Sequence, residues 1–282
     1  MQAPAHLSRV LRTPWPGVHA TQIESGRHFA RHWHATYGLG LVDAGAQRSA
    51  SGRGTVEAFA GDLLATNPGE VHDGQPLGGP TRRWRIVYLE PQVLADQHGG
   101  AQAGEIALEC AAFHDPALRR ALQALLDRLQ AWESAPDGAA ALACDEALAR
   151  TCGLLLARHA TAAAPRADAG GDMARVRERL AEGLLETPSL EALAALAGIG
   201  KYQLLRRFAK TYGLTPHAWL LQLRAERARG LIGRGTPLAA AAAAGGFADQ
   251  SHMTRVFTRQ FGFTPGAWRR AALSPRADSP SG

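Results

Sequence analysis

The sequence predicts a two-domain α+β protein, with an N-terminal β-barrel flanked by helices and a C-terminal domain made only of helices. Three observations lead to this prediction. One helical pattern occurs twice near the C-terminus, short alternating apolar runs separated by glycines occur near the N-terminus, and two apolar helical seams lie between them. At 282 residues the chain is long enough for two domains with separate cores.

The C-terminal duplication is the strongest of the three observations. Shifting Thr187–Trp219 forward by 49 positions places it on Thr236–Trp268 without a gap, and 12 of the 33 positions are then identical. The identical pairs include Thr-Pro, Phe, Gly and Trp, which match by chance far less readily than alanines do in this Ala-rich chain. Two copies of one supersecondary unit are therefore expected, rather than a solenoid, which needs more copies.

Thr-Pro pairs mark the expected helix starts in both copies. Threonine can cap the free amides of a helix, and proline at the first helical position loses no hydrogen bond. The predicted starts are Thr187-Pro188, Thr215-Pro216, Thr236-Pro237 and Thr264-Pro265.

Each copy also has the apolar pattern of a helix-turn-helix. In the first copy, a stripe of three leucines precedes a break at residues 198–200, and a second helix carries Leu204 and Phe208 inward before it ends at Gly213. In the second copy, Asp249 is placed to cap a helix over residues 250–261. The leucines of the stripe are Leu190, Leu193 and Leu196.

The positive charge of the chain lies in this duplicated region. Residues 172–282 contain 16 Lys+Arg against 8 Asp+Glu, a balance of +8, whereas residues 1–171 contain 15 against 17, a balance of −2. A surface that binds phosphates requires such an excess of positive charge, although a solvated arginine-rich face has the same composition. Combined with two helix-turn-helix units, the charge favours a nucleic-acid partner.

The C-terminal region resembles the DNA-binding domain of the AraC/XylS family of bacterial transcription regulators. The resemblance rests on Leu190–Gly213, Thr215–Trp219 and, most specifically, residues 246–257 and 261–269. It implies seven helices, with one recognition helix in each copy entering successive major grooves on one face of double-stranded DNA. It also implies RNA polymerase as a partner, as for a transcription activator, and a homodimer.

The resemblance places the recognition helices at about 201–212 and 250–261. Their DNA-facing residues would be Lys201, Tyr202, Leu205 and Arg206 in the first, and Gln250, Ser251, His252 and Arg255 in the second. Arg207, Lys210, Arg259 and Arg269 are better interpreted as phosphate contacts, which position a protein without specifying bases. The chemistry agrees, since Arg pairs with guanine edges and Gln with adenine.

Two features depart from the family pattern. Residues 238–244 are almost pure alanine where bulkier apolar residues are usual, so this helix either packs closely or is less stable. Gly200 stands where a serine-like cap is usual, which weakens the first recognition helix by only about a few tenths of a kcal/mol.

The N-terminal region reads as an all-β barrel or sandwich. The expected strands include Leu39–Val42, Thr55–Phe59, Leu63–Ala65 and Trp84–Leu89, separated by turn residues. Residues 61–64, followed by residues 68–72 and preceded by His32-Trp33-His34, resemble a cupin-type barrel. Such barrels form the effector-sensing domain in many regulators of this family, which implies a small-molecule effector.

The histidines of this motif have three interpretations. Metal-dependent cupins use a His-x-His pair, a glutamate and a later histidine; His32, His34 and His72 match, but residues 37–39 occupy the place of the glutamate. Three imidazoles with an open position suit Zn, Fe or Cu. We favour an effector pocket without a metal, lined by His32, His34, Tyr37 and His72, with Trp33 and Arg85 as further candidates. Structural histidines are the third interpretation.

Two amphipathic helices are expected between the domains. Their seams are Leu118, Leu122, Leu125, Leu129 and Trp132 in the first, and Leu142, Leu148, Cys152 and Leu155 in the second. Such a seam packs either within its own domain or, as is common in this family, against a second protomer. The expected boundaries are 1–110 for the sensor, 111–160 for these helices, 161–171 for a linker, 172–272 for the DNA-binding domain and 273–282 for a tail.

Other sequence features limit the functional class. Three cysteines without metal-ligand spacing fit a reducing cytoplasm, and Cys144 and Cys152 look like core residues. We find no signal segment, no apolar run long enough for a membrane span, and no catalytic or nucleotide-binding motif. The sequence therefore predicts a cytoplasmic, effector-responsive transcription regulator that is not an enzyme and needs no cofactor. The alternative is a metal-dependent cupin enzyme fused to a DNA-binding module.

Overall fold

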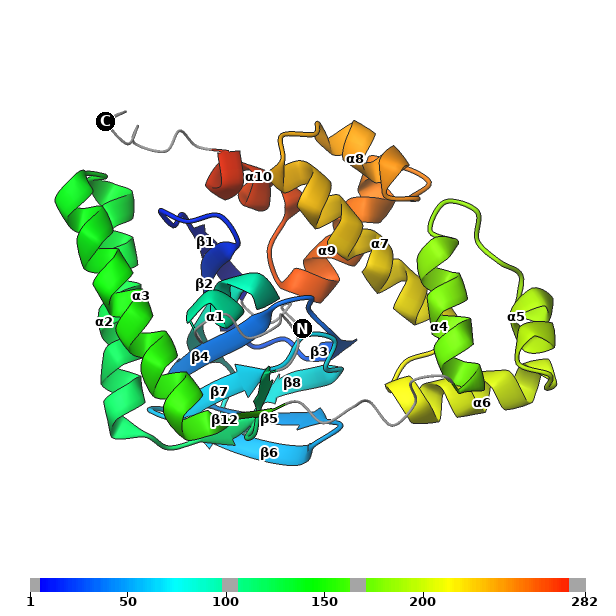
Figure 1. Ribbon diagram of the computed structural model, residues 1–282, viewed down its shortest axis with the longest axis horizontal. Coiled ribbons are helices and arrows are strands. Elements are labelled where there is room, and N and C mark those ends of the chain that lie inside the picture. The colour runs from blue at the N-terminus through cyan, green and yellow to red at the C-terminus, as the bar shows by residue number, and fades with distance from the viewer. Residues whose placement is uncertain (1–5, 98–105, 163–170, 274–282) are drawn as a thin grey trace. The chain divides into compact units, whose positions relative to one another are not determined.

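The computed structural model describes residues 6–97, 106–162 and 171–273, which belong to two compact units (Figure 1). The first unit is rich in β-strands and carries three helices, and the second consists of helices. This two-domain α+β organisation confirms the predicted fold class. Most of the predicted linker and almost all of the predicted tail lie outside the described residues.

The β-rich unit contains two larger sheets and one small ribbon. The larger sheets have the strand orders β1-β2-β9-β4-β7-β11 and β3-β8-β5-β6, and β10 pairs with β12 in the ribbon. The predicted strands at residues 39–42, 55–59, 63–65 and 84–89 are confirmed. The strands are β1 (His6–Leu11), β2 (Val18–Ser25), β3 (Phe29–His32), β4 (Tyr37–Ala44), β5 (Ala46–Ser51), β6 (Gly54–Phe59), β7 (Leu63–Thr66), β8 (His72–Pro76), β9 (Arg82–Leu89), β10 (Ile106–Leu108), β11 (Ala112–Phe113) and β12 (Ala160–Ala162).

The small ribbon corrects the predicted start of the linker. Thr161 and Ala162 lie in β12, where they pair with Ala107 and Ile106 of β10. The prediction of a linker from Thr161 was wrong for these two residues, because their backbone groups are used in strand pairing that a composition argument does not detect.

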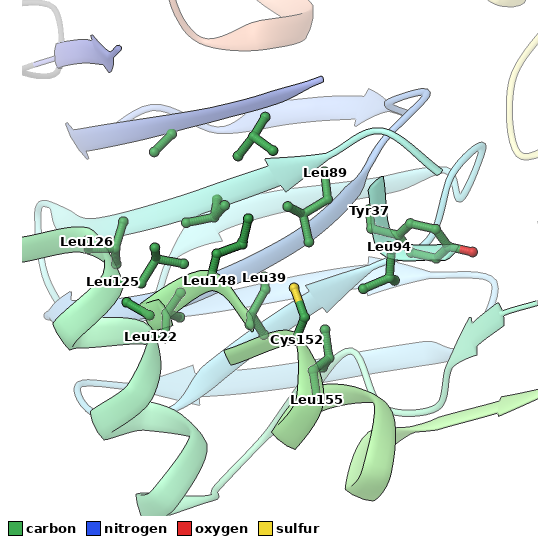
Figure 2. Packing of buried hydrophobic residues seen from close by; sticks show 14 of the residues in the cluster. Tyr37, Leu39, Leu89, Leu94, Leu122, Leu125, Leu126, Leu148, Cys152 and Leu155 are labelled. Carbon is green, nitrogen blue, oxygen red and sulfur yellow. The ribbon is translucent and has the colours of Figure 1, made fainter. Parts of the chain in front are cut away.

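One face of the six-stranded sheet is covered by helices. Those helices are α1 (Pro91–Gln97), α2 (Pro116–Ser134) and α3 (Gly138–His159), and α2 and α3 lie side by side in Figure 1. Figure 2 shows the resulting core, in which Leu39 and Leu89 of the sheet meet side chains of α2 and α3. Each buried side chain of this kind contributes about 1.5–3 kcal/mol.

The predicted helical seams lie in this core, with one exception. Leu118, Leu122, Leu125, Leu129 and Trp132 are all buried, as are Leu148, Cys152 and Leu155, whereas Leu142 is 60% exposed. The prediction that Leu142 belongs to the second seam was wrong, because Leu142 lies in the first turns of α3, on the solvent side. Packing within the same domain is thus the correct interpretation of both seams. Burial raises the pKa of the Cys152 thiol to about 12, as expected for a core cysteine.

The helical unit contains seven helices within residues 171–273, as the family resemblance implies. In both copies the second helix ends on a left-handed glycine, Gly213 with φ of 74° and Gly262 with φ of 76°, a conformation that favours glycine. The helices are α4 (Asp172–Glu182), α5 (Leu190–Leu196), α6 (Lys201–Tyr212), α7 (Pro216–Gly233), α8 (Leu238–Ala244), α9 (Gln250–Phe261) and α10 (Pro265–Leu273).

Two of the four predicted Thr-Pro starts are confirmed and two were wrong. Thr215 caps α7 and Thr264 caps α10, each through a hydroxyl that accepts a backbone hydrogen bond. In contrast, α5 begins at Leu190 with Ser189 as its cap, because the Thr187 hydroxyl accepts a hydrogen bond from Arg224 instead. The start of α8 is likewise displaced to Leu238, since the Thr236 amide donates to the end of α7.

The alanine-rich helix α8 packs closely rather than loosely. Ala241 and Ala242 are fully buried, and so is Ala228 on the adjacent helix α7. Small side chains on both helices allow this close approach, and Arg227 donates to the last carbonyl of α8 at 2.9 Å. In α5 the predicted stripe is incomplete, because Leu193 is buried but Leu196 is 37% exposed.

Within the described ranges, none of the helices combines the length and the hydropathy that crossing a membrane requires.

Candidate DNA-binding surface and ligand pocket

Helices α6 and α9 occupy equivalent places in the two helix-turn-helix copies. Each has 12 residues, and each inserts two fully buried anchors one turn apart, Leu204 and Phe208 in α6, and Met253 and Phe257 in α9. Asp249 caps α9 by accepting from the His252 amide at 2.6 Å, whereas Gly200 gives α6 no side-chain cap. The predicted bounds of both helices are confirmed.

The predicted DNA-facing residues lie mostly on the solvent side of these helices. Exposed side chains are Lys201, Tyr202, Arg206, Arg207 and Lys210 in α6, Gln250, Ser251, Arg255 and Arg259 in α9, and Arg269 in α10. Leu205 and His252 are half-buried. The anchors fix which side of each helix faces the core, so the opposite side is available to a partner.

Several of these side chains already have neighbours. Lys201 donates to Glu191 at 2.6 Å, a hydrogen bond that holds the pKa of this exposed carboxyl below its usual value. The Arg206 guanidinium lies 5.9 Å from the Tyr202 ring, so the two form one exposed group at the start of α6. Exposed pairs of this kind contribute little stability.

The 49-residue offset adds one position to the candidate DNA-facing residues. Leu205 corresponds to Thr254, which is half-buried in α9. His252 was chosen instead, yet its ring packs edge-on against Phe247 at 5.3 Å, with a plane angle of 87°. The offset alone contained the information needed to include Thr254.

The side chains of His32, His34 and His72 converge. One ring nitrogen of each lies within 4.8 Å of those of the other two, and His32 and His34 are buried. The prediction that the His-x-His pair lies close to the later histidine is therefore confirmed.

The loop before β8 holds His72 in place. The His72 Nδ1 lies 2.9 Å from the Glu70 carbonyl oxygen, and burial lowers the pKa of this imidazole. A neutral ring that donates from Nδ1 leaves Nε2 with its lone pair. The Glu70 carboxylate is itself fixed by two hydrogen bonds from Arg53, each 2.8 Å long.

Tyr37 does not lie with the histidines. Its side chain lies in the core beneath the helices, as Figure 2 shows, and its hydroxyl donates to the Ile106 carbonyl at 2.6 Å. Tyr88 takes the expected position, because it pairs with Gly38 across the sheet and its ring lies 5.4 Å from that of His34. Predicting Tyr37 was wrong, since one residue along a strand changes the face of the sheet.

Tyr88 and His19 were not predicted from the sequence. His19 pairs with Tyr88 in register and stacks on it at 4.8 Å with a plane angle of 14°. The alternation of β9 contained this information, because Val87 and Leu89 belong to the core and Tyr88 must then face the other way. An aromatic and polar group of four residues therefore forms, made of His19, His34, His72 and Tyr88.

Arg85 and Trp33 differ from the histidines in their surroundings. The Arg85 guanidinium is bound by two carboxylates, Asp43 at 2.9 Å and Asp127 at 3.0 Å, and these contacts raise its pKa against the effect of burial. An arginine that already pairs with two carboxylates is poorly suited to bind an anion. Trp33 is buried.

The three imidazoles can hold a metal ion, but among the residues that the structure describes no fourth His, Cys, Asp or Glu joins them. Imidazole nitrogens suit Zn, Fe or Cu, and the Glu70 carbonyl provides the outer hydrogen bond that orients a ligating histidine. The glutamate of the cupin pattern is replaced here by Gly38, where a Cβ would lie 2.6 Å from the Thr66 hydroxyl. A side chain at that position would therefore require a neighbouring group to move.

The fold and the two sites define a class of protein, namely a regulator that joins a ligand-binding β-domain to a tandem helix-turn-helix domain. Two family models match the chain: "AraC-like ligand binding domain" over residues 16–150 and "Helix-turn-helix domain" over residues 193–271. The HTH-type transcriptional regulator YbfI of Bacillus subtilis (strain 168) is 30% identical over 227 residues, which cover 80% of this chain and 81% of YbfI. The chain belongs to the AraC/XylS family of transcription regulators.

Solved structures with a similar fold include ToxT from Vibrio cholerae O395. Its TM-score to this chain is 0.51 at 10% identity, covering 96% of this chain and 99% of ToxT. ToxT from Vibrio cholerae strain SCE256 with a bound unsaturated fatty acid also has a TM-score of 0.51, at 9% identity, covering 99% of this chain and 100% of ToxT. At these identities the similarity concerns the fold.

Proposed function

We propose that this regulator reads two DNA half-sites, one with α6 and one with α9. The observation that carries the proposal is the equivalence of the two helices, with Arg206 and Arg255 exposed at matching positions. Recognition helices in successive major grooves lie about 34 Å apart, or one helical turn of DNA. The remaining basic side chains bind phosphates and fix the register.

Arg255→Ala is expected to relax base preference in one half-site and to cost about 1–3 kcal/mol of binding free energy. Arg255 is exposed on α9, and in the described ranges it makes no ion pair that would have to be broken first. Selection of bound sequences from a random pool measures the change. Arg206→Ala is the matched control, because it should relax the other half-site. A uniform loss of affinity across both half-sites would instead make Arg255 a phosphate contact.

We further propose that the effector binds beside His34, His72 and Tyr88. Imidazoles and a phenol offer hydrogen-bond donors and acceptors to a small polar or anionic molecule. ToxT, which shares this fold, has been solved with a fatty acid, whose carboxylate is an anionic group of this kind. The effector acts by binding one arrangement of the protein more tightly than another.

His34→Ala is expected to abolish the transcriptional response and to leave basal DNA affinity nearly unchanged, because the histidine lies in the other unit. The measurement is a reporter fused to a bound promoter, with operator binding of the purified protein measured in parallel. His28→Ala is the control, since His28 is an exposed histidine of the same unit. If His34→Ala responds normally, the histidines are scaffolding for the barrel.

A metal-dependent function is the second candidate, because the three imidazoles converge. The same variants test it if metal content is measured on protein purified without a His tag. Stoichiometric Zn, Fe or Cu that is lost in His34→Ala and His72→Ala, but kept in His28→Ala, would favour a metal site and with it the cupin-enzyme alternative. We favour a regulator that performs no catalysis.

The proposal extends to partners and location. We propose a cytoplasmic protein that contacts RNA polymerase at its promoters and acts as a homodimer. Because the seams of α2 and α3 are buried within the unit, the dimer would use their outer sides, where Leu142 is exposed. We also propose that the sensor extends through α3 rather than ending at residue 110, since α2 and α3 share one core with the sheet.

A further inference from the structure

Arg82 is a buried cation that forms no ion pair with any acidic residue of the described ranges. Its side chain lies at the start of β9 and only 3% of the residue is exposed. Among the residues that the structure describes, no carboxylate forms an ion pair with it, in contrast to Arg85 on the same strand. Burial lowers its pKa to about 10, still far above neutral pH, so the guanidinium is charged. An unpaired buried charge is costly to a folded protein.

The contacts that Arg82 does make are incomplete. Its Nε donates to the Gln47 side chain at 3.0 Å, and its Nη1 donates to the Arg27 carbonyl at 3.2 Å. The guanidinium also lies 4.6 Å from the centre of the Trp84 ring, which holds it in position. Within the described part of the chain, the N–H groups of Arg82 form these two hydrogen bonds. A guanidinium carries more than two donors, so some of its donors are unused.

Gly74 of β8 lies beside the unused donors. A Cβ added to Gly74 would lie 3.2 Å from the Arg82 Nη2, and apart from residues 73–75 no other described atom comes within 4 Å of that Cβ. Gly74 and His72 are two residues apart on one strand, so they share a face at about 6.6 Å separation. The free edge of the guanidinium therefore lies on the same face of β8 as the imidazole of His72.

We propose that Arg82 binds the carboxylate of the effector, which enters the space beside Gly74 and extends toward His72. A guanidinium presents paired donors that match the two oxygens of a carboxylate, and such charge-assisted bonds are among the strongest in proteins. The effector is then a small carboxylic acid with a second polar group near the imidazoles. This inference rests on the proposed sensor function and names the chemical class of its ligand.

The test compares carboxylates with their neutral amides on the full chain. Butyrate, succinate and benzoate are each paired with the corresponding amide, and the shift in unfolding temperature is measured as each is titrated. At least one carboxylate should raise the midpoint where its amide does not. In Arg82→Gln the apparent Kd for that carboxylate should rise about tenfold or more. Arg83→Gln, an exposed neighbour on the opposite face, should keep the wild-type Kd.

Two outcomes would overturn the proposal, namely no difference between any carboxylate and its amide in the wild-type protein, or an unchanged Kd in Arg82→Gln. If Arg82→Gln does not fold, Arg82→Lys is tested instead, because lysine keeps the charge but lacks the paired donors. The Kd of Arg82→Lys for the carboxylate should also rise about tenfold. These measurements involve no DNA. A failure here therefore leaves the DNA-binding proposal intact. A normal response of His34→Ala would reject the proposed effector site, but it would not reject carboxylate binding at Arg82.

Discussion

Replacing Phe257 by alanine is expected to cost about 3–5 kcal/mol of stability in the helical unit and to abolish DNA binding. Phe257 is fully buried in α9, where its ring lies 4.5 Å from that of Phe261 and 5.9 Å from that of Phe263. These aromatic rings hold α9 to the start of α10. Denaturant unfolding of the full chain, followed by far-ultraviolet circular dichroism, measures the loss.

Two other variants make this result specific. Arg259→Ala lies two residues further along the same helix and is exposed, so its stability should stay within about 0.5 kcal/mol of wild type while its DNA affinity falls. Phe208→Ala is the equivalent change in the first copy and should have a similar cost. A Phe257→Ala protein with wild-type stability would mean that α9 is held mainly by contacts other than this core.

The bounds of the recognition helices were predictable because their determinants are local. Asp249 caps the first turn of α9, and Gly213 and Gly262 end the two helices with positive φ, all within the segments themselves. The helix starts at Thr187 and Thr236 were not predictable in this way. The Thr187 hydroxyl is taken by Arg224, a residue 37 positions away in the chain, so tertiary contact overrides the local preference.

The pocket was predictable in part for a similar reason. His32, His34 and His72 were identified by spacing, which constrains a barrel strongly, whereas Tyr37 was included by its proximity in sequence to His34. Choosing between Tyr37 and its cross-strand neighbours requires knowledge of which face the helices cover, and that depends on α2 and α3. Arg82, which we propose to bind the effector, was not predicted, because a sequence does not show that an arginine is buried without a carboxylate among the described residues.

The DNA-binding unit by itself should bind DNA with a steep dependence on salt. A fragment of residues 172–282 carries the +8 balance and both recognition helices, and within it Phe208 packs against Trp219 and Phe257 packs against Phe263. If it neutralises about six to ten phosphates, its affinity should fall by about 10³–10⁵ between about 50 and 200 mM salt. Fluorescence anisotropy of a labelled duplex measures this dependence.

The matched control for the fragment is the other half of the chain. Residues 1–171 have a balance of −2 and should not bind the duplex at any of these salt concentrations. The fragment should also ignore the effector, because His34, His72 and Arg82 are absent from it. A folded fragment without affinity at low salt would show that the exposed arginines of α6 and α9 do not meet phosphates. In that case the positive charge of this unit would serve solubility or another partner, and the assignment of its recognition helices would have to be abandoned.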